Sequence, residues 1–308
     1  MEEQKENLEI THHPKEGSSW KWIAILAVAV LALTQIYAIG KNAQKKSSAD
    51  SNQNNEAVNS ENEVLRTEGV ELPIKWQDLG GKLVETGVID ASKFESLYAG
   101  RGGLTPEEKE LLSGLVSGKI IMTERNSAFW LNLLWAFGLA NKNPILEKGP
   151  MQDTQYGGAE NFASTGGWTL ARGNPMNHYS KHEFIKLTPD QQLLAEEVSK
   201  GIYRPCCGNS TYFPDCNHGM AMLGLLELMV ANGATEKEMY QVALQVNSYW
   251  FPDTYLTIDK YLKMKDMSLA TADPKEILGI NYSSAYGYAN ILKQTQPVER
   301  KSEGGCGV

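Results

Sequence analysis

The stretch FWLNLLWAFGLA, from Phe129 to Ala140, carries one strongly polar residue, Asn132, in an otherwise apolar run. A helix needs about 20 apolar residues to cross a bilayer, so this run is too short to serve as a membrane anchor. An apolar run of this length predicts a helix that is buried on all sides. We therefore expect it to form the centre of a globular core, with the rest of the folded chain packed around it.

Helix-start signals recur on both sides of this run, whereas the alternating pattern of strands does not. At three places a threonine is followed three residues later by Glu or Gln, which is the spacing of a capping box. These pairs are Thr105 with Glu108, Thr188 with Gln191, and Thr235 with Glu238. Asp90 and Gly100 bracket a further helix. The chain is therefore predicted to form one mostly α-helical globular domain.

The composition limits the class of protein. The chain has 308 residues, of which 42% are hydrophobic and 21% charged, enough for one sizeable core or two small ones. Its formal net charge is -8, and it has no dense Lys/Arg tract. A protein that follows a nucleic-acid backbone needs a positive surface to displace counterions. Nucleic acid is therefore not expected as a partner.

A second apolar run, WKWIAILAVAVLALTQIYAI from Trp20 to Ile39, has the length of a membrane-spanning helix. Trp20 and Tyr37 lie near its two ends, where aromatic side chains meet the membrane interfaces. A run rich in Ser, Asn and Glu follows, and no clear signal-peptide cleavage site is present. The predicted organisation is a short tail (1–19), a transmembrane anchor (20–40), a flexible polar linker (41–71), the helical domain (72–298) and a mobile tail (299–308).

The lysines that flank the predicted anchor are evenly divided, so the positive-inside rule does not decide its orientation. A short tail, one span and a long polar linker are typical of a domain tethered outside a bacterial membrane. An oxidising compartment also suits clustered cysteines. We expect a single-pass protein of the cell membrane with an extracytoplasmic domain, so that the membrane is one partner, through the N-terminal helix.

The stretch YRPCCGNSTYFPDCNHGMAMLGLLELM, from Tyr203 to Met229, concentrates the residues that bind metals. It holds three of the four cysteines of the chain, and two further histidines lie shortly before it. If Asp215 caps a helix, the Cys and His that follow fall in its first turn, where the helix dipole lowers a cysteine pKa. The candidate metal ligands are Cys206, Cys207, Cys216, His218, Met220, His178 and His182.

Three interpretations of this cluster stay open. Thiolates and imidazole suit a Cu or Zn ion, so the first is a metal site for sensing, delivery or detoxification. The second is a cysteine-dependent enzyme, in which Cys207 or Cys216, activated by His218, carries out thiol exchange or acyl transfer. The third is a cluster without chemistry, either a disulfide-stapled interaction domain or small buried hydrophobes. The chain has no motif for covalent haem, nucleotide or flavin binding.

Some of these candidates have a simpler explanation. Met222 belongs to an apolar stripe at helical spacing and is expected to pack in the core, which leaves Met220 as the candidate methionine. His178 and His182 are four residues apart and would share a helix face, but they suit a solvated helix equally well. The Gly-rich stretch 156–175 fits either a lid over the cysteines or a plain surface loop.

The fourth cysteine, Cys306, lies in the C-terminal sequence KSEGGCGV, where glycines on both sides predict a mobile tail. Five residues of this tail resemble the shuttling thiol tails of some disulfide reductases and mercury-handling enzymes. The resemblance implies that Cys306 reaches a donor or acceptor of metal or thiols, which is the second expected partner.

Overall fold

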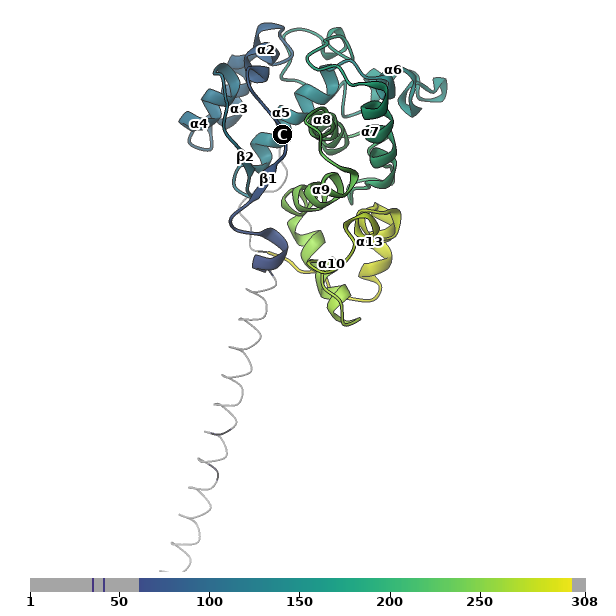
Figure 1. Cartoon of the computed structure of the whole chain (residues 1–308). Coiled ribbons are helices and arrows are strands. Elements are labelled where there is room, and N and C mark those ends of the chain that lie inside the picture. Colours follow the sequence, from purple (N-terminus) through teal and green to yellow (C-terminus); the bar gives the residue numbers. More distant parts are fainter. Residues whose placement is uncertain (1–34, 36–40, 42–60, 301–308) are drawn as a thin grey trace, which may run out of the picture. The chain divides into compact units, whose positions relative to one another are not determined.

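The computed structural model describes residues 61–300, together with Gln35 and Lys41. The predicted anchor (20–40, apart from Gln35), most of the linker and the tail cysteine Cys306 lie outside the described residues. Within the described part of the chain, no helix combines the length and the hydropathy that a bilayer crossing requires. The described part forms a mostly helical globular domain, as the sequence predicts (Figure 1).

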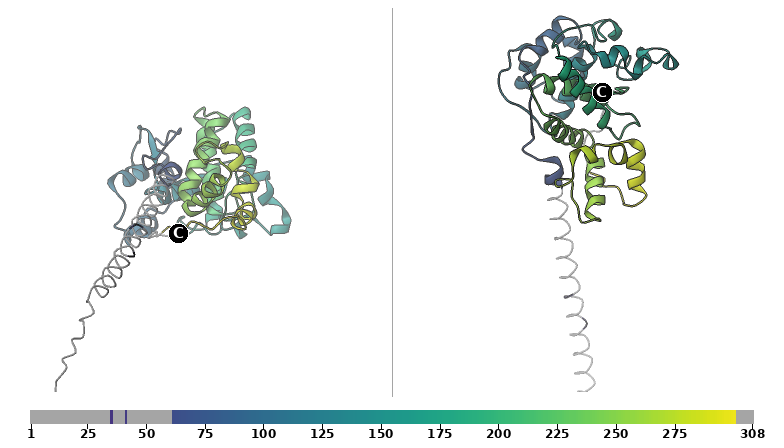
Figure 2. Two further views of the ribbon diagram at one scale, coloured as in Figure 1. Left: turned by 90° about the horizontal axis from the view of Figure 1, so that it is seen from below. Right: turned by 45° about the vertical axis from the view of Figure 1, so that its right-hand side comes forward.

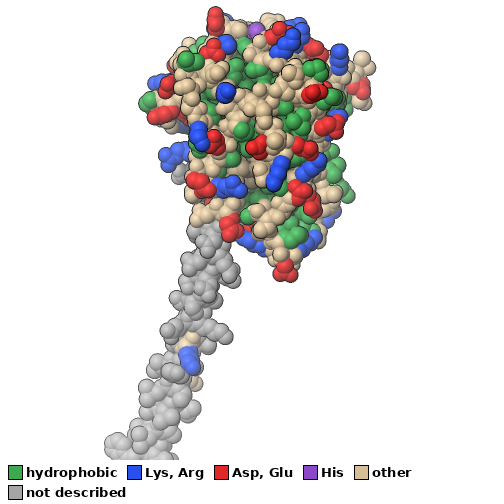
Figure 3. Space-filling view, viewed as in Figure 1, with side chains coloured by type: hydrophobic (Ala, Val, Ile, Leu, Met, Phe, Trp, Pro, Cys, Tyr) green, Lys and Arg blue, Asp and Glu red, His purple; other side chains and the backbone are tan. Residues whose placement is uncertain are grey.

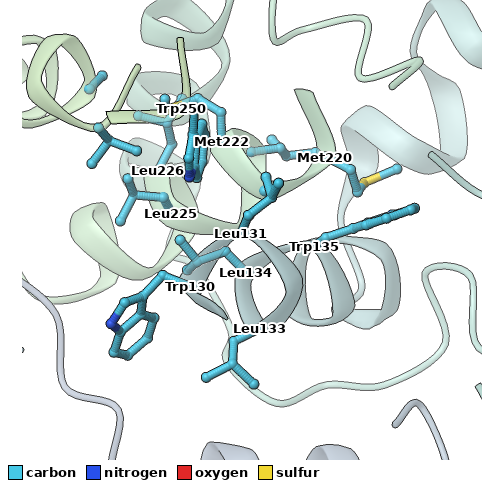
Figure 4. Close-up of a cluster of buried hydrophobic side chains, with 14 of the residues drawn as sticks. Trp130, Leu131, Leu133, Leu134, Trp135, Met220, Met222, Leu225, Leu226 and Trp250 are labelled. Atoms are coloured by element: carbon cyan, nitrogen blue, oxygen red, sulfur yellow. The ribbon is translucent and has the colours of Figure 1, made fainter. Parts of the chain in front are cut away.

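Two helices form the centre of the domain, α5 (Ser127–Ala140) and α8 (Asn217–Ala231). Every residue of α5 from Phe129 to Ala140 is buried, which confirms the central helix predicted from this run. Figure 4 shows side chains of both helices in one hydrophobic cluster, to which Trp250 also contributes. A helix that is apolar on all sides needs partners on all sides, so the other helices surround this pair.

Two glycines bring the backbones of α5 and α8 into direct contact. A Cβ atom at Gly138 would lie 2.3 Å from the carbonyl oxygen of Met220. A Cβ atom at Gly224 would lie 2.6 Å from the carbonyl oxygen of Leu134. Because both obstacles are backbone atoms, the two helices cross this closely only with glycine at these positions.

The surrounding helices form groups that are local in sequence. They are α2 (Leu79–Glu85), α3 (Ala91–Ala99), α4 (Pro106–Ser113), α6 (Pro144–Lys148), α7 (Pro189–Gly201), α9 (Glu236–Trp250), α10 (Pro252–Lys263), α11 (Pro274–Ile277), α12 (Ile280–Ser283) and α13 (Ala285–Leu292). The short 3-10 helices η1 (Pro150–Gln152), η2 (Thr154–Tyr156), η3 (Ala159–Asn161) and η4 (Pro175–Asn177) lie between α6 and α7 in the chain. In Figure 1, α2, α3 and α4 lie on one side of α5 and α8, and α7 lies on the other. In both views of Figure 2 the N-terminal helices (blue) stay apart from the C-terminal helices (yellow).

Local capping sequences start several of these helices where they are predicted. The capping boxes of Thr105, Thr188 and Thr235 are all present, at the beginnings of α4, α7 and α9. Asp90 caps α3 with its side chain, and Gly100 is the C-cap residue of the same helix. These signals satisfy backbone amides within one turn, so they depend little on the rest of the fold.

The folded domain includes residues 61–71, which the sequence assigns to the linker. Residues 61–65 are helical, and Val64 and Leu65 are 2% and 3% exposed. The side chain of Gln245 on α9 donates a hydrogen bond to the Val64 carbonyl at 2.9 Å. This segment is therefore fixed by tertiary contacts that its polar composition does not indicate.

Two short strands and an ion-pair network join segments that lie far apart in the chain. The strands β1 (Val70–Leu72) and β2 (Ile120–Met122) pair antiparallel. Arg300, which the sequence analysis assigns to the tail, forms ion pairs with Glu61 at 2.9 Å and with Glu124 at 2.5 Å.

Over the face of the domain shown in Figure 3, positively and negatively charged side chains are interspersed.

Candidate metal centre

The three clustered cysteines lie between α7 and α8, on a segment that folds back on itself and that we call the cysteine loop (residues 203–216). Tyr203 and Ser210 form an antiparallel bridge within it. The amide of Thr211 donates a hydrogen bond to the Ile202 carbonyl at 2.8 Å. These bonds close a tight turn, which places the two adjacent cysteines next to the beginning of α8.

A buried arginine joins the two ends of the cysteine loop. Arg204 is 1% exposed, and its guanidinium donates to the carboxylate of Asp215 and to the carbonyls of Asn209 and Phe213 at 3.2 and 3.1 Å. Its Nε donates to the sulfur of Cys216 at 3.0 Å. Four acceptors on one planar guanidinium fix the conformation of the loop.

Sequence reasoning did not single out Arg204, although two signals for it exist. It stands directly before Pro-Cys-Cys, and a glycine, Gly219, lies in the first turn of α8. A Cβ atom at Gly219 would lie 2.5 Å from the Cζ atom of Arg204. The glycine therefore leaves the space that the buried guanidinium occupies.

Three sulfur atoms, an imidazole and a carboxylate converge at the end of the cysteine loop. The sulfurs of Cys206 and Cys216 lie 3.5 Å apart, and Cys207 Sγ lies 3.7 Å from Asp215 Oδ1. Ligand atoms of Cys206, Cys216 and His218 all lie within 4.8 Å of one another, as do those of Cys207, Asp215 and Cys216. The three cysteines are free thiols. The cluster is therefore assembled so that it can hold a metal ion, and Asp215 is a member that sequence reasoning missed.

The helix that follows begins one residue later than predicted. α8 starts at Asn217 with Cys216 as its N-cap residue, whose side chain makes no capping hydrogen bond. The prediction that Asp215 is the N-cap is wrong, because its carboxylate is occupied by Arg204 and by the side-chain amide of Asn209 at 2.9 Å. Cys216 therefore lies at the N-terminal end of α8, where the helix dipole stabilises a thiolate.

Mutual hydrogen bonding gives the three thiols different pKa values. Hydrogen bonds from Cys206 and Cys207 lower the pKa of Cys216 well below its usual range, and His218 and Arg204 act in the same direction, against the effect of burial. The contacts of Cys206 with Cys207 and Cys216, together with burial, raise the pKa of Cys206. Hydrogen bonding with Cys206 lowers the pKa of Cys207, but its contact with Cys216 and its burial outweigh this and raise it to about 11. Cys216 is thus the first of the three to ionise, with the other two thiols donating to its sulfur.

The imidazole lies on the buried side of the cluster. His218 is 5% exposed, and its ring centroid lies 4.4 Å from that of Phe251 and 5.7 Å from that of Trp250. Both aromatic residues lie at the end of α9. Packing against α9 therefore restricts the orientation of the ring before any ligand arrives.

The other candidate ligands from the sequence lie elsewhere. His178 and His182 form a pair of their own, with His178 Nδ1 3.1 Å from His182 Nε2, and neither belongs to the two groups of converging ligand atoms. The amide of His182 donates to the Ala140 carbonyl at 2.9 Å, at the end of α5. Burial and the neighbouring His178 lower the pKa of His182. Met220 is fully buried and lies beside Trp135 in the hydrophobic cluster (Figure 4), so its side chain serves the core.

The Gly-rich stretch 156–175 packs against the cysteine loop. The amide of Ser164 donates to the Asp215 carbonyl at 3.2 Å. The rings of Tyr156, Phe162 and Phe213 form a three-membered cluster with centroids 5.3 to 5.4 Å apart. This stretch is therefore held beside the cysteines by contacts on both sides of Pro214.

Comparison of the chain with protein-family models, with curated proteins and with solved structures gives no match in any of the three.

Proposed function

We propose that this protein binds a thiophilic transition metal of the Cu or Zn class at the cysteine loop. The ligands are Cys206, Cys216 and His218, and either Cys207 or Asp215 supplies a fourth. The observation that carries the proposal is the convergence of two sulfurs and one ring nitrogen within 4.8 Å. Zinc takes sulfur and nitrogen ligands in a tetrahedron, and soft sulfur ligands also suit Cu(I).

The charge around the cluster supports a divalent ion. Arg204, which is buried, and Asp215, whose side chain is 20% exposed, form an ion pair that is neutral as a unit. Two thiolates and one neutral imidazole then balance the charge of Zn²⁺, and the fourth ligand adds none, whether it is the Cys207 thiol or the carboxylate already paired with Arg204. A partly buried site of this composition carries no net charge, which avoids the main cost of burying ions.

We further propose that the domain is held at the cell membrane by residues 20–40 and lies outside the cytoplasm, where it senses, delivers or detoxifies the metal. The apolar run, the polar sequence that follows it and the clustered thiols support this placement. Cys306, on the C-terminal tail, is the proposed point of exchange with a metal or thiol partner.

Metal analysis of the full-length chain, purified without affinity tags or chelators, tests the metal proposal. We expect one bound ion per chain, and loss of most of it in each of the variants Cys206→Ser, Cys216→Ser and His218→Ala, because a closed site loses both a bond and its geometry. The variant Cys306→Ser is the matched control and should keep the ion. Metal that survives loss of all three clustered cysteines would refute the proposal and direct attention to His178 and His182.

An impermeant thiol reagent applied to intact cells tests the membrane placement. Cys306 lies apart from the proposed metal ligands in the sequence, so it should be labelled if the domain is external. Protection of this cysteine until the membrane is permeabilised would instead place the domain in the cytoplasm.

A second function is favoured by one observation, the 3.5 Å separation of the Cys206 and Cys216 sulfurs. A thiolate at Cys216 can attack a substrate disulfide, and Cys206 can then resolve the mixed disulfide and release a reduced substrate. In this case His218→Ala leaves the number of free thiols unchanged, whereas Cys206→Ser traps the mixed disulfide on Cys216. Thiol counting after exposure to a small disulfide separates this function from metal binding.

A further inference from the structure

We infer that the cysteine loop also binds trivalent arsenic or antimony, through the sulfurs of Cys206, Cys207 and Cys216 and without His218. This inference rests on the proposed function, because it assigns a further ligand class to the same thiols. The two ligand classes differ in what they require: a transition metal uses the imidazole, whereas the trivalent ion uses three sulfurs.

Two of the three sulfurs lie close to the third, that of Cys216. Cys206 Sγ lies 3.5 Å from Cys216 Sγ. The sulfurs of Cys207 and Cys216 lie within 4.8 Å of each other. Trivalent arsenic keeps a lone pair and binds three ligands as a pyramid, so it requires a triangle of sulfurs and no fourth ligand. The cysteine loop supplies three such sulfurs, with that of Cys216 near each of the other two.

The three sulfurs are accessible, and the loop that carries them is held in place. Cys206 is exposed, and Cys207 and Cys216 are half-buried, so a small ion reaches the sulfurs from solvent. Arg204 holds the two ends of the loop together through Asp215 and the backbone of Phe213. Because the loop already holds the thiols near one another, binding loses little conformational entropy in ordering the loop.

The binding reaction is balanced without any oxidant or reductant. In arsenous acid, As(OH)₃, three As–O bonds break and three As–S bonds form. The three hydroxyl groups leave as water with two protons from the thiols of Cys206 and Cys207 and a third from the solvent where Cys216 is already a thiolate. Arsenic stays trivalent and no sulfur is oxidised. The product is neutral beside the neutral pair of Arg204 and Asp215, so the site again buries no net charge.

Titration of the reduced full-length chain with sodium arsenite, and separately with Zn²⁺, tests this inference. The readouts are the mass of the intact adduct and the number of thiols that still react with a disulfide reagent. We expect one equivalent of arsenite to protect three thiols. Cys206→Ser, Cys207→Ser and Cys216→Ser should each weaken arsenite binding more than about tenfold, since even an outer-sphere partner of a metal is worth about that much.

Two control variants separate the ligand classes. His218→Gln should keep arsenite binding and lose Zn²⁺ binding, and Cys306→Ser should keep both. Protection of fewer than three thiols, or unchanged arsenite affinity in Cys207→Ser, would overturn the inference, and the thiol count in the unmodified protein decides this even if a serine variant does not fold. Zn²⁺ binding without arsenite binding would refute this inference alone, whereas arsenite binding without Zn²⁺ binding would refute the transition-metal proposal alone.

Discussion

Arg204 donates a hydrogen bond from its buried Nε to the sulfur of Cys216 at 3.0 Å, while Nη2 of the same guanidinium donates to the carboxylate of Asp215. One side chain therefore fixes the cysteine loop and stabilises the thiolate at the beginning of α8. Burial alone would lower the pKa of Arg204, but the negative charge of Cys216 and its neighbours raises it. The conformation of the cysteine loop and the pKa of Cys216 therefore both depend on Arg204.

Replacement of Arg204 should destabilise the fold and weaken the thiolate at once. Arg204→Met leaves the carboxylate of Asp215 without its cation, which costs about 2 kcal/mol, less than for a fully buried pair because Asp215 is 20% exposed. We expect a lower free energy of unfolding in urea and a higher pKa of Cys216, measured from the ultraviolet absorbance of the thiolate. Arg172→Lys is the control, because Arg172 is exposed. Unchanged thiol titration in Arg204→Met would show that the guanidinium has no role in the chemistry.

Alkylation with iodoacetamide should distinguish the three thiols by pH. The pKa of Cys216 is lowered mainly by hydrogen bonds from Cys206 and Cys207, so Cys216 should stay reactive below the usual cysteine pKa of about 8.5. Cys206 and Cys207 should react only above it. Peptide mapping of the modified protein identifies the order, and prior reaction of Cys206 at neutral pH would contradict it.

The lowered pKa of Cys216 also predicts how the free energy of unfolding depends on pH. Between the folded pKa of Cys216 and about 8.5, the unfolded chain binds more protons than the folded chain at this position. The contribution of Cys216 is therefore fully present above about 8.5 and is lost as the pH falls through its folded pKa. Cys216→Ser should remove this contribution, which urea unfolding at several pH values would show.

Glu227 on α8 should make the fold less stable as the pH rises. It is fully buried and accepts a hydrogen bond from Asn141 at 2.6 Å, and burial raises its pKa to about 8. Between about 4.3 and 8 the folded chain keeps a proton that the unfolded chain releases, so stability falls by up to about 1.4 kcal/mol per pH unit. Glu227→Gln mimics the protonated acid and should flatten this slope.

The matched control for that experiment is Glu183→Gln, at an exposed position. It should leave the pH dependence of urea unfolding as it is in the unmodified protein. An equal slope in Glu227→Gln and the unmodified chain would mean that the buried carboxyl does not titrate in this range.

The close crossing of α5 and α8 should not tolerate even one methyl group. Gly224→Ala places a Cβ 2.6 Å from a backbone oxygen of α5, so the helices must separate at a cost of about 2 kcal/mol or more. Gly81→Ala on α2 is the control, since its Cβ would meet no atom within 4 Å and alanine favours a helix by up to about 1 kcal/mol. Thermal unfolding should therefore shift in opposite directions in the two variants.

Several features of the fold were predictable because they are local. The capping boxes at Thr105, Thr188 and Thr235 satisfy amides within their own first turns, so four consecutive residues contain the whole interaction. The buried helix at Phe129–Ala140 follows from an apolar run that water does not solvate and that is too short for a bilayer. The clustering of three cysteines and His218 was likewise visible, because the chain keeps them within a few residues of one another.

The sequence by itself therefore determined the helical class, the central helix and the identity of the clustered thiols and imidazole. Only the tertiary structure decided that Arg204 is buried among them, that Asp215 binds this arginine instead of capping α8, and that His178 and His182 pair at the end of α5. It also decided that Val64 joins the core through Gln245, which lies 181 residues away in the chain. The reason is physical: a charge or a polar side chain is buried only where distant segments supply its partners, and those partners leave no mark in the neighbouring sequence.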